Sequence, residues 1–161
     1  MTTYADKSAR LRDIASDFDD FRHAVHEAGH LLLAVHFGVE IDYATVIPPT
    51  LDSFGVVYMN QEHLDALPPA DACVIFCAGG IAEMRHLKKK SFFFPDGDQQ
   101  HFERAISRAA TEDRDRIRRE AKYIANAMIV RNWELLDRLA RELYVKQTLT
   151  EAEAKQIINT F

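Results

Sequence analysis

The segment from Ala24 to Val35 constrains this chain more than any other, because it joins a metal-ligand spacing to a helical pattern. His26 and His30 are four residues apart, and Glu27 directly follows the first histidine. On an α-helix, residues at this spacing share one face, with Cβ atoms about 5–6 Å apart. Two imidazoles placed in this way can both reach one zinc ion at roughly 2.0–2.1 Å. The segment therefore predicts a helix that carries part of a metal site.

Glu27 lies about 100° around such a helix from His26 and is poorly placed as a third ligand. Its carboxylate can still accept a proton from a water that the ion holds, which releases a hydroxide-like nucleophile. This arrangement is the His-Glu-Xaa-Xaa-His signature of zinc peptidases. The residues therefore predict Zn²⁺ as the cofactor, His26 and His30 as metal ligands, and Glu27 as the catalytic base.

The third metal ligand must come from elsewhere in the chain, because a catalytic zinc usually has three protein ligands and keeps a position for water. Glu83 follows a Gly-Gly pair in a helix that we expect to pack on the histidine helix. Asp98 stands at the start of a later helix, and His101 lies one turn beyond it. Position and residue type alone leave these three candidates open.

The composition of the chain limits its function classes. With 161 residues, of which 47% are hydrophobic, the chain fits one globular domain with a substantial core. Its net charge of −5 argues against a nucleic-acid partner. We expect no membrane span and no signal peptide, because no apolar run has the required length. Cys73 and Cys77 have no second ligand pair at zinc spacing, which favours buried reduced thiols in a cytoplasmic protein.

The hydrophobic pattern predicts an α+β protein, mostly α-helical with a small β-sheet of two or three short strands. It has a zincin-type motif helix and a C-terminal helical bundle. Residues 1–19 are a polar N-terminal segment, and residues 20–161 form one peptidase-like domain. Helices are expected over about 20–37, 69–90, 98–110 and 111–144, the last as one helix or two in tandem, and after a capping box at 150–153; strands are expected over 43–49 and 54–59.

The second predicted strand, from Phe54 to Tyr58, is the candidate substrate-binding strand. A strand at the edge of a sheet offers unpaired backbone groups, and a peptide can add to it as an extra strand beside the metal. Phe54, Gly55, Val56 and Val57 are therefore the candidate substrate-binding residues. The alternative is a core hairpin without this role, which the sequence favours equally.

These motifs, in this order, resemble the peptidase domain of FtsH-like AAA+ zinc metalloproteases. The segment His26–His30 matches the motif of that family to the residue. Ala44–Pro48 is similar to its strand after the motif helix, and Phe54–Val57 is similar to its edge strand. Ala78–Glu83 resembles its Gly-Gly-Xaa-Xaa-Ala-Glu helix, and Leu135–Leu143 resembles its C-terminal helices. The resemblance covers roughly residues 20–160.

The resemblance implies a choice among the candidate ligands. In that family the third ligand is an aspartate at the start of the helix after the Ala-Glu helix, which selects Asp98. The spacing to the following Arg104 aligns His101 with that position instead. The ligand set implied by the resemblance is therefore His26, His30 and Asp98, with His101 and Glu83 as the alternatives.

The resemblance also implies an activity: a zinc-dependent endopeptidase that hydrolyses unfolded or flexible polypeptides with Glu27 as general base. The sequence contains no Gly-Xaa-Xaa-Xaa-Xaa-Gly-Lys-Ser/Thr phosphate-binding loop, so it implies a stand-alone peptidase domain without the ATPase module. A homo-oligomer and a separate ATPase partner are the assemblies to consider. The alternative function is a catalytically inactive, peptidase-like binding or regulatory module that assembles with a partner.

Overall fold

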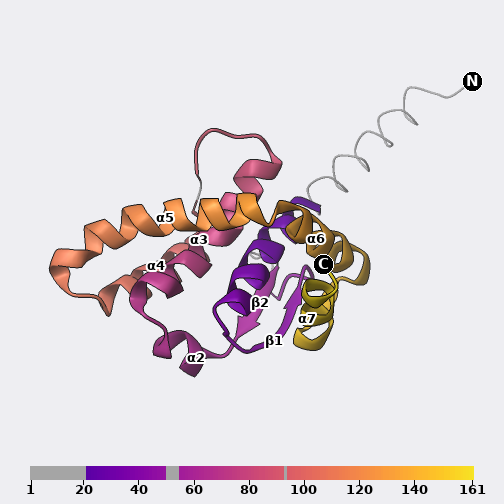
Figure 1. Cartoon of the computed structure of the whole chain (residues 1–161), viewed down its shortest axis with the longest axis horizontal. Helices are drawn as coiled ribbons and strands as arrows, with labels where there is room; N and C mark the ends of the chain where they lie inside the picture. Colours follow the sequence, from indigo (N-terminus) through magenta and orange to yellow (C-terminus); the bar gives the residue numbers. More distant parts are fainter. Residues whose placement is uncertain (1–20, 50–54, 93) are drawn as a thin grey trace, which may run out of the picture.

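A computed structural model of the chain describes residues 21–49, 55–92 and 94–161. A helix over residues 21–36, called the motif helix below, comes first among them. The elements that follow are β1 (Ile41–Thr45), β2 (Val56–Met59), α2 (Gln61–Ala66), α3 (Pro69–His86), α4 (Asp96–Ser107), η1 (Thr111–Asp113), α5 (Arg114–Arg131), α6 (Trp133–Lys146), β3 (Thr148–Thr150) and α7 (Glu151–Asn159). The predicted class, mostly α with a small β-sheet, is confirmed (Figure 1). The predicted N-terminal segment, 1–19, lies outside the described residues.

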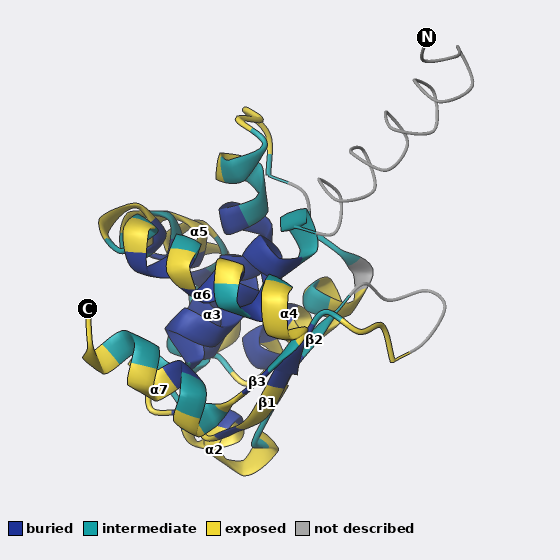
Figure 2. Cartoon of the chain, turned by 90° about the vertical axis from the view of Figure 1, so that its right-hand side faces the viewer, coloured by how far each residue is buried: buried dark blue, intermediate teal, exposed yellow. Residues whose placement is uncertain are grey.

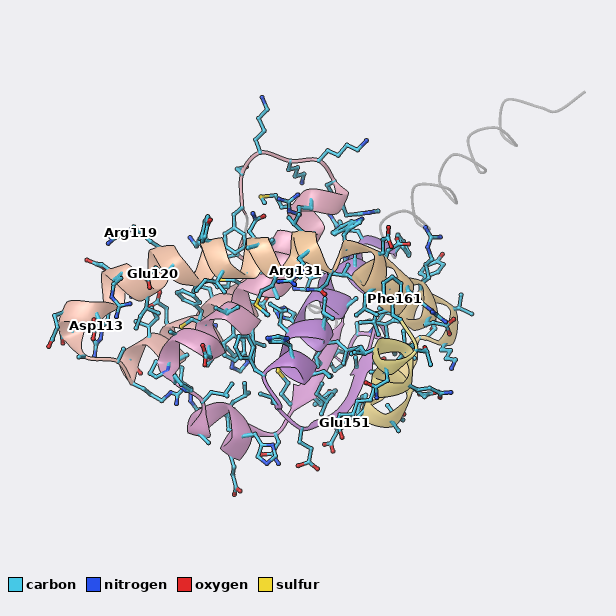
Figure 3. All side chains as sticks on the ribbon, in the orientation of Figure 1. Asp113, Arg119, Glu120, Arg131, Glu151 and Phe161 are labelled. Atoms are coloured by element: carbon cyan, nitrogen blue, oxygen red, sulfur yellow. The ribbon has the colours of Figure 1, made fainter. Side chains whose placement is uncertain are left out.

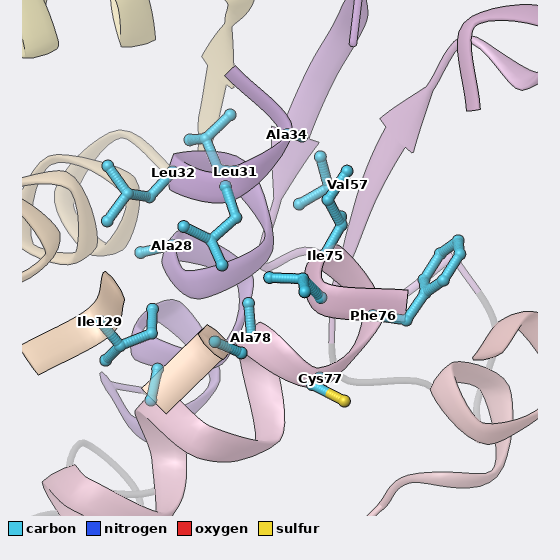
Figure 4. Packing of buried hydrophobic residues seen from close by; sticks show 14 of the residues in the cluster. Ala28, Leu31, Leu32, Ala34, Val57, Ile75, Phe76, Cys77, Ala78 and Ile129 are labelled. Carbon is cyan, nitrogen blue, oxygen red and sulfur yellow. The ribbon is translucent and has the colours of Figure 1, made fainter. Parts of the chain in front are cut away.

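The motif helix and α3 form the centre of the molecule. Every residue from 24 to 34 and from 72 to 82 is buried, which is expected of helices that are apolar on all sides (Figure 2). The two helices approach closely at Gly29, where an added Cβ would lie 2.7 Å from the carbonyl oxygen of Ala78. Leu31, Ile75 and Ile129 belong to the core around this contact (Figure 4).

The sheet contains three antiparallel strands in the order β2-β1-β3. Ala44 of β1 pairs with Val57 of β2 and with Leu149 of β3. All three of these residues are buried, so one face of the sheet packs on the core. Within the described chain β2 is an edge strand, because only β1 pairs with it.

Helices α4 and α5 pack on α3, and α5 runs along it (Figure 1). Four residues of α5 at helical spacing are buried: Ile117, Ala121, Ala125 and Ile129. The opposite face of α5 is exposed and charged, with Arg119, Glu120 and Arg131 pointing to solvent (Figure 3). The pattern over 111–144 therefore forms tandem helices, which break at Asn132, where φ is −112° and ψ is 26°.

Candidate metal centre

The motif helix presents His26 and His30 on one face, as their spacing predicts. Only 8% of His26 and 3% of His30 is exposed. Their Nε2 atoms lie 3.2 Å apart, so both rings direct the same nitrogen to one point. The helix around them is apolar and buried, and this packing fixes its rotation.

Asp98 brings a carboxylate to the same point from the first turn of α4. Its Oδ2 lies 3.0 Å from Nε2 of His26 and 3.1 Å from Nε2 of His30. Among the described residues, His26, His30 and Asp98 form the only group of three histidine, cysteine or acidic side chains spaced to hold one metal ion. The structure thus brings together the three residues that the resemblance selected.

The other ring nitrogen of each histidine contacts an acceptor on α3. Nδ1 of His26 lies 3.1 Å from Oε2 of Glu83, and Nδ1 of His30 lies 2.8 Å from the carbonyl oxygen of Ile75. Because both acceptors require a donor, each neutral ring carries its proton on Nδ1 and turns the lone pair of Nε2 inward. Partners of this kind fix the orientation of metal-binding histidines in many proteins.

This donor set fits a tetrahedral zinc ion. Two Nε2 lone pairs and one carboxylate oxygen converge with separations of 3.0–3.2 Å. Ligand atoms at tetrahedral corners, each about 2.0–2.1 Å from zinc, lie about 3.3 Å apart. Three electron-rich atoms at such distances repel one another unless a cation or protons lie between them.

The charges of the metal-free cluster follow from the same geometry. Burial disfavours a charged His26, but hydrogen bonds to Asp98 and Glu83 outweigh it and raise the pKa of the imidazole to about 10. Burial works against ionisation of Asp98 as well, yet the two imidazoles hold the pKa of its carboxyl well below the usual range. Protons on the imidazoles thus provide positive charge when no ion is bound.

Glu27 lies beside the cluster without belonging to the group of three. Only 7% of it is exposed, and burial raises the pKa of its carboxyl, against the attraction of the His26 and His30 imidazoles. It faces the start of β2, where an added Cβ on Gly55 would lie 2.9 Å from Oε1 of Glu27. A buried carboxylate between a metal-ligand cluster and an edge strand is well placed to transfer protons.

The structure separates the candidates for the third ligand. Glu83 contacts the Nδ1 side of His26, and its other oxygen lies 3.7 Å from Nε of Arg22, so it faces away from the converging Nε2 atoms. His101 is outside the cluster and stacks on Phe76, with ring centroids 5.2 Å apart. Asp98 is thus the candidate that the fold brings to the two histidines.

The candidate substrate strand is only partly described. Phe54 lies outside the described residues. Gly55 leads into β2, in which Val57 is buried and Val56 is partly buried. Because β2 is an edge strand of the described sheet, its outer side satisfies the requirement for strand addition.

Two contacts of the site could not be predicted from residue types. The carbonyl of Ile75 belongs to the backbone, which has no sequence signature. Glu83 is recognisable in the sequence as an acidic residue after the Gly-Gly pair. From the sequence we expected a possible metal ligand there, whereas its carboxylate contacts Nδ1 of His26. A four-residue spacing on α3 links Ile75, Gly79 and Glu83, and it could have identified this face.

Comparison with known proteins gives a partial similarity. A protein of Arabidopsis thaliana, described as a membrane-bound transcription factor site-2 protease homolog, is 36% identical to the chain over 56 residues. The matched stretch is 35% of this chain and 11% of the plant protein. No family model matches the chain. The similarity concerns a protease and does not single out the FtsH-like family.

Among the described helices, none is both long and apolar enough to cross a bilayer.

Proposed function

We propose that the chain is a zinc-dependent endopeptidase of the FtsH-like type, with His26, His30 and Asp98 as zinc ligands and Glu27 as general base. The observation that carries the proposal is the convergence of two Nε2 atoms and Oδ2 of Asp98 within 3.0–3.2 Å beside the buried Glu27. The partial similarity to a protease supports the reaction class. The order of motifs along the chain supports the FtsH-like assignment.

The residues have distinct tasks in this proposal. A zinc ion held by the three ligands would polarise the scissile carbonyl and lower the pKa of a water. Glu27 accepts a proton from the attacking water and delivers it to the leaving amine. Glu83 and the carbonyl of Ile75 keep the imidazoles oriented.

The proposed substrate is an extended segment of polypeptide. Strand addition to β2 requires free backbone N–H and C=O groups, which folded proteins rarely present outside mobile segments. Unfolded or flexible polypeptides already expose these backbone groups. The segment from Gly55 to Val57 would align such a chain beside Glu27.

The variant Glu27→Gln tests the proposal. It should keep zinc at wild-type occupancy, because Glu27 is not among the ligands, and it should lose cleavage of an unfolded protein such as casein by 10²-fold or more. Zinc is measured by elemental analysis and cleavage by peptide release. The exposed Glu103→Gln is the matched control, with zinc and activity both retained. Full activity in Glu27→Gln, or a wild-type protein without zinc affinity, would overturn the proposal.

A further inference from the structure

Two glycines from different elements lie against the candidate site. Gly79 is in the middle of α3, and Gly55 immediately precedes β2. We propose that both are positioning residues with separate tasks: Gly79 sets the imidazole pair for the metal, and Gly55 sets the carboxylate of Glu27. This inference rests on the proposed function and assigns to each glycine the part of the site that it touches.

Gly79 lies directly behind both imidazoles. A Cβ built on it would lie 2.6 Å from Nε2 and 2.7 Å from Cδ2 of His26, and it would overlap Nε2 of His30. Real Cβ atoms essentially never approach this closely, so a methyl group here must displace the rings. The rings cannot move without loss, because Nδ1 of His30 is bound to the Ile75 carbonyl and Nδ1 of His26 to Glu83.

The spacing on α3 explains why glycine is required at that position. Ile75, Gly79 and Glu83 follow one another at four-residue intervals and so lie along one face of α3. The outer two bind the histidines, which are themselves four residues apart, and the helices run antiparallel there because His30 meets Ile75 and His26 meets Glu83. The middle position faces the space that the two Nε2 atoms occupy. Only a residue without a side chain leaves that space open.

Gly55 has the equivalent relation to Glu27. An added Cβ would lie 2.8 Å from Cγ and 2.9 Å from Oε1 of Glu27. It would also lie 2.9 Å from the carbonyl oxygen of Thr45, which belongs to the β1 backbone and cannot easily move. The added methyl group therefore pushes the flexible Glu27 carboxylate aside and also moves the start of β2 away from Thr45. The missing side chain allows Glu27 to lie directly against the start of the edge strand where the proposed substrate pairs.

Gly29 and Gly97 have different surroundings, and Gly97 provides a matched control. Gly29 meets the backbone of Ala78, so its contact holds two helices together and touches no ligand. A Cβ on Gly97 would have nothing within 4 Å. Gly97→Ala therefore adds the same methyl group one residue from Asp98 without a collision.

The first experiment titrates purified metal-free protein with Co²⁺ and Zn²⁺ and follows the visible absorption of bound Co²⁺. We expect Gly79→Ala to weaken metal binding on the order of 100-fold, in the upper range for loss of groups that orient ligands. Gly97→Ala and Gly55→Ala should bind as wild type does. Wild-type affinity in Gly79→Ala would overturn the assignment of Gly79. A wild type that binds neither ion would instead overturn the proposed function.

A double-mutant cycle tests Gly79 without metal, even where the variant is unstable. If the added methyl group collides with an imidazole, Gly79→Ala should lower the urea midpoint of the metal-free protein. The same change in a His26→Ala/His30→Ala background, from which both rings are gone, should lower it much less. An equal loss in both backgrounds would show that the methyl group meets something other than the imidazoles, which overturns the proposal.

The second experiment measures kcat and KM of Gly55→Ala with a fluorogenic unfolded substrate. A displacement of the base by about 1 Å costs on the order of 10² in rate. We therefore expect kcat to fall about 100-fold with zinc fully retained. A purely structural defect would instead lower thermal stability and zinc occupancy together. Wild-type kcat, or a loss confined to KM, would contradict the task assigned to Gly55.

Discussion

In the proposed metal site, the carboxylate of Asp98 adds the third ligand to the two histidines of the motif helix. Its Oδ2 lies within 3.1 Å of both Nε2 atoms, whereas His101 stacks on Phe76 one turn further along α4. Asp98→Ala should therefore weaken zinc binding on the order of 10²-fold or more, because one of the three proposed protein ligands is lost. His101→Ala removes a side chain from the same helix and should leave zinc affinity unchanged. Competition with a chelator of known affinity measures both.

If His101→Ala weakened zinc binding and Asp98→Ala did not, the assignment of Asp98 would be wrong. His101 would then be the third ligand, as the spacing to Arg104 allows.

At this scale the sequence predicted what depends on local spacing. His26, Glu27 and His30 lie within one turn of a helix, so their relative placement follows from helical geometry alone. Asp98 is 68 residues beyond His30, and its position beside the two histidines depends on how α3 and α4 pack. The resemblance supplied that residue where periodicity could not. The contacts at Nδ1 depend on the antiparallel crossing of two helices, which the sequence does not encode locally.

Among the elements, α7 begins with a complete capping box. The hydroxyl of Thr150 accepts a hydrogen bond from the Glu153 N–H, and the Glu153 carboxylate accepts one from the Thr150 N–H. Thr150→Ala should lower the free energy of unfolding by about 1 kcal/mol, as loss of a helix cap usually does. Urea denaturation measures the change. Thr150→Ser keeps the hydroxyl and should recover most of the loss; an equal loss in both variants would mean that the cap is not its cause.

Elements with strong periodicity were predicted well, and short ones were not. The prediction missed α2, which has only one buried residue, Leu64, and β3, which has three residues and exists by pairing with β1. The predicted extension of α3 to residue 90 was wrong, because the helix ends at His86 and Lys88 adopts a positive φ of 53°. The predicted first strand began two residues late. Tertiary pairing and chain reversals set such boundaries, and local composition reveals them poorly.

At the scale of the whole molecule, two buried thiols should make the free energy of unfolding decrease at alkaline pH. Burial raises the pKa of both Cys73 and Cys77 to about 12, above the ordinary value of 9.0 that a thiol has in an unfolded chain. Between these values the unfolded chain loses protons that the folded chain keeps, so the stability supplied by the neutral thiols decreases as pH rises. We expect the free energy of unfolding to fall by about 2–3 kcal/mol between pH 8 and pH 10 from this cause, since each of the two thiols contributes about 1.4 kcal/mol.

Urea titrations at pH 8, 9 and 10 test this expectation. The double variant Cys73→Ala/Cys77→Ala serves as the comparison, because it keeps every other titrating group. Its stability should decline less steeply with pH than that of the wild type. Parallel declines would show that the thiols do not contribute.

The long interval between His30 and Asp98 has a consequence for a chain that is still being synthesised. When the motif helix leaves the ribosome, it carries His26, His30 and the proposed base Glu27, but Asp98 of α4 has not yet been synthesised. The three-ligand cluster can form only after translation has passed α4. The nascent chain is extended and would therefore be a good substrate, but the proposed catalytic site would not yet be complete while that part of the chain is synthesised.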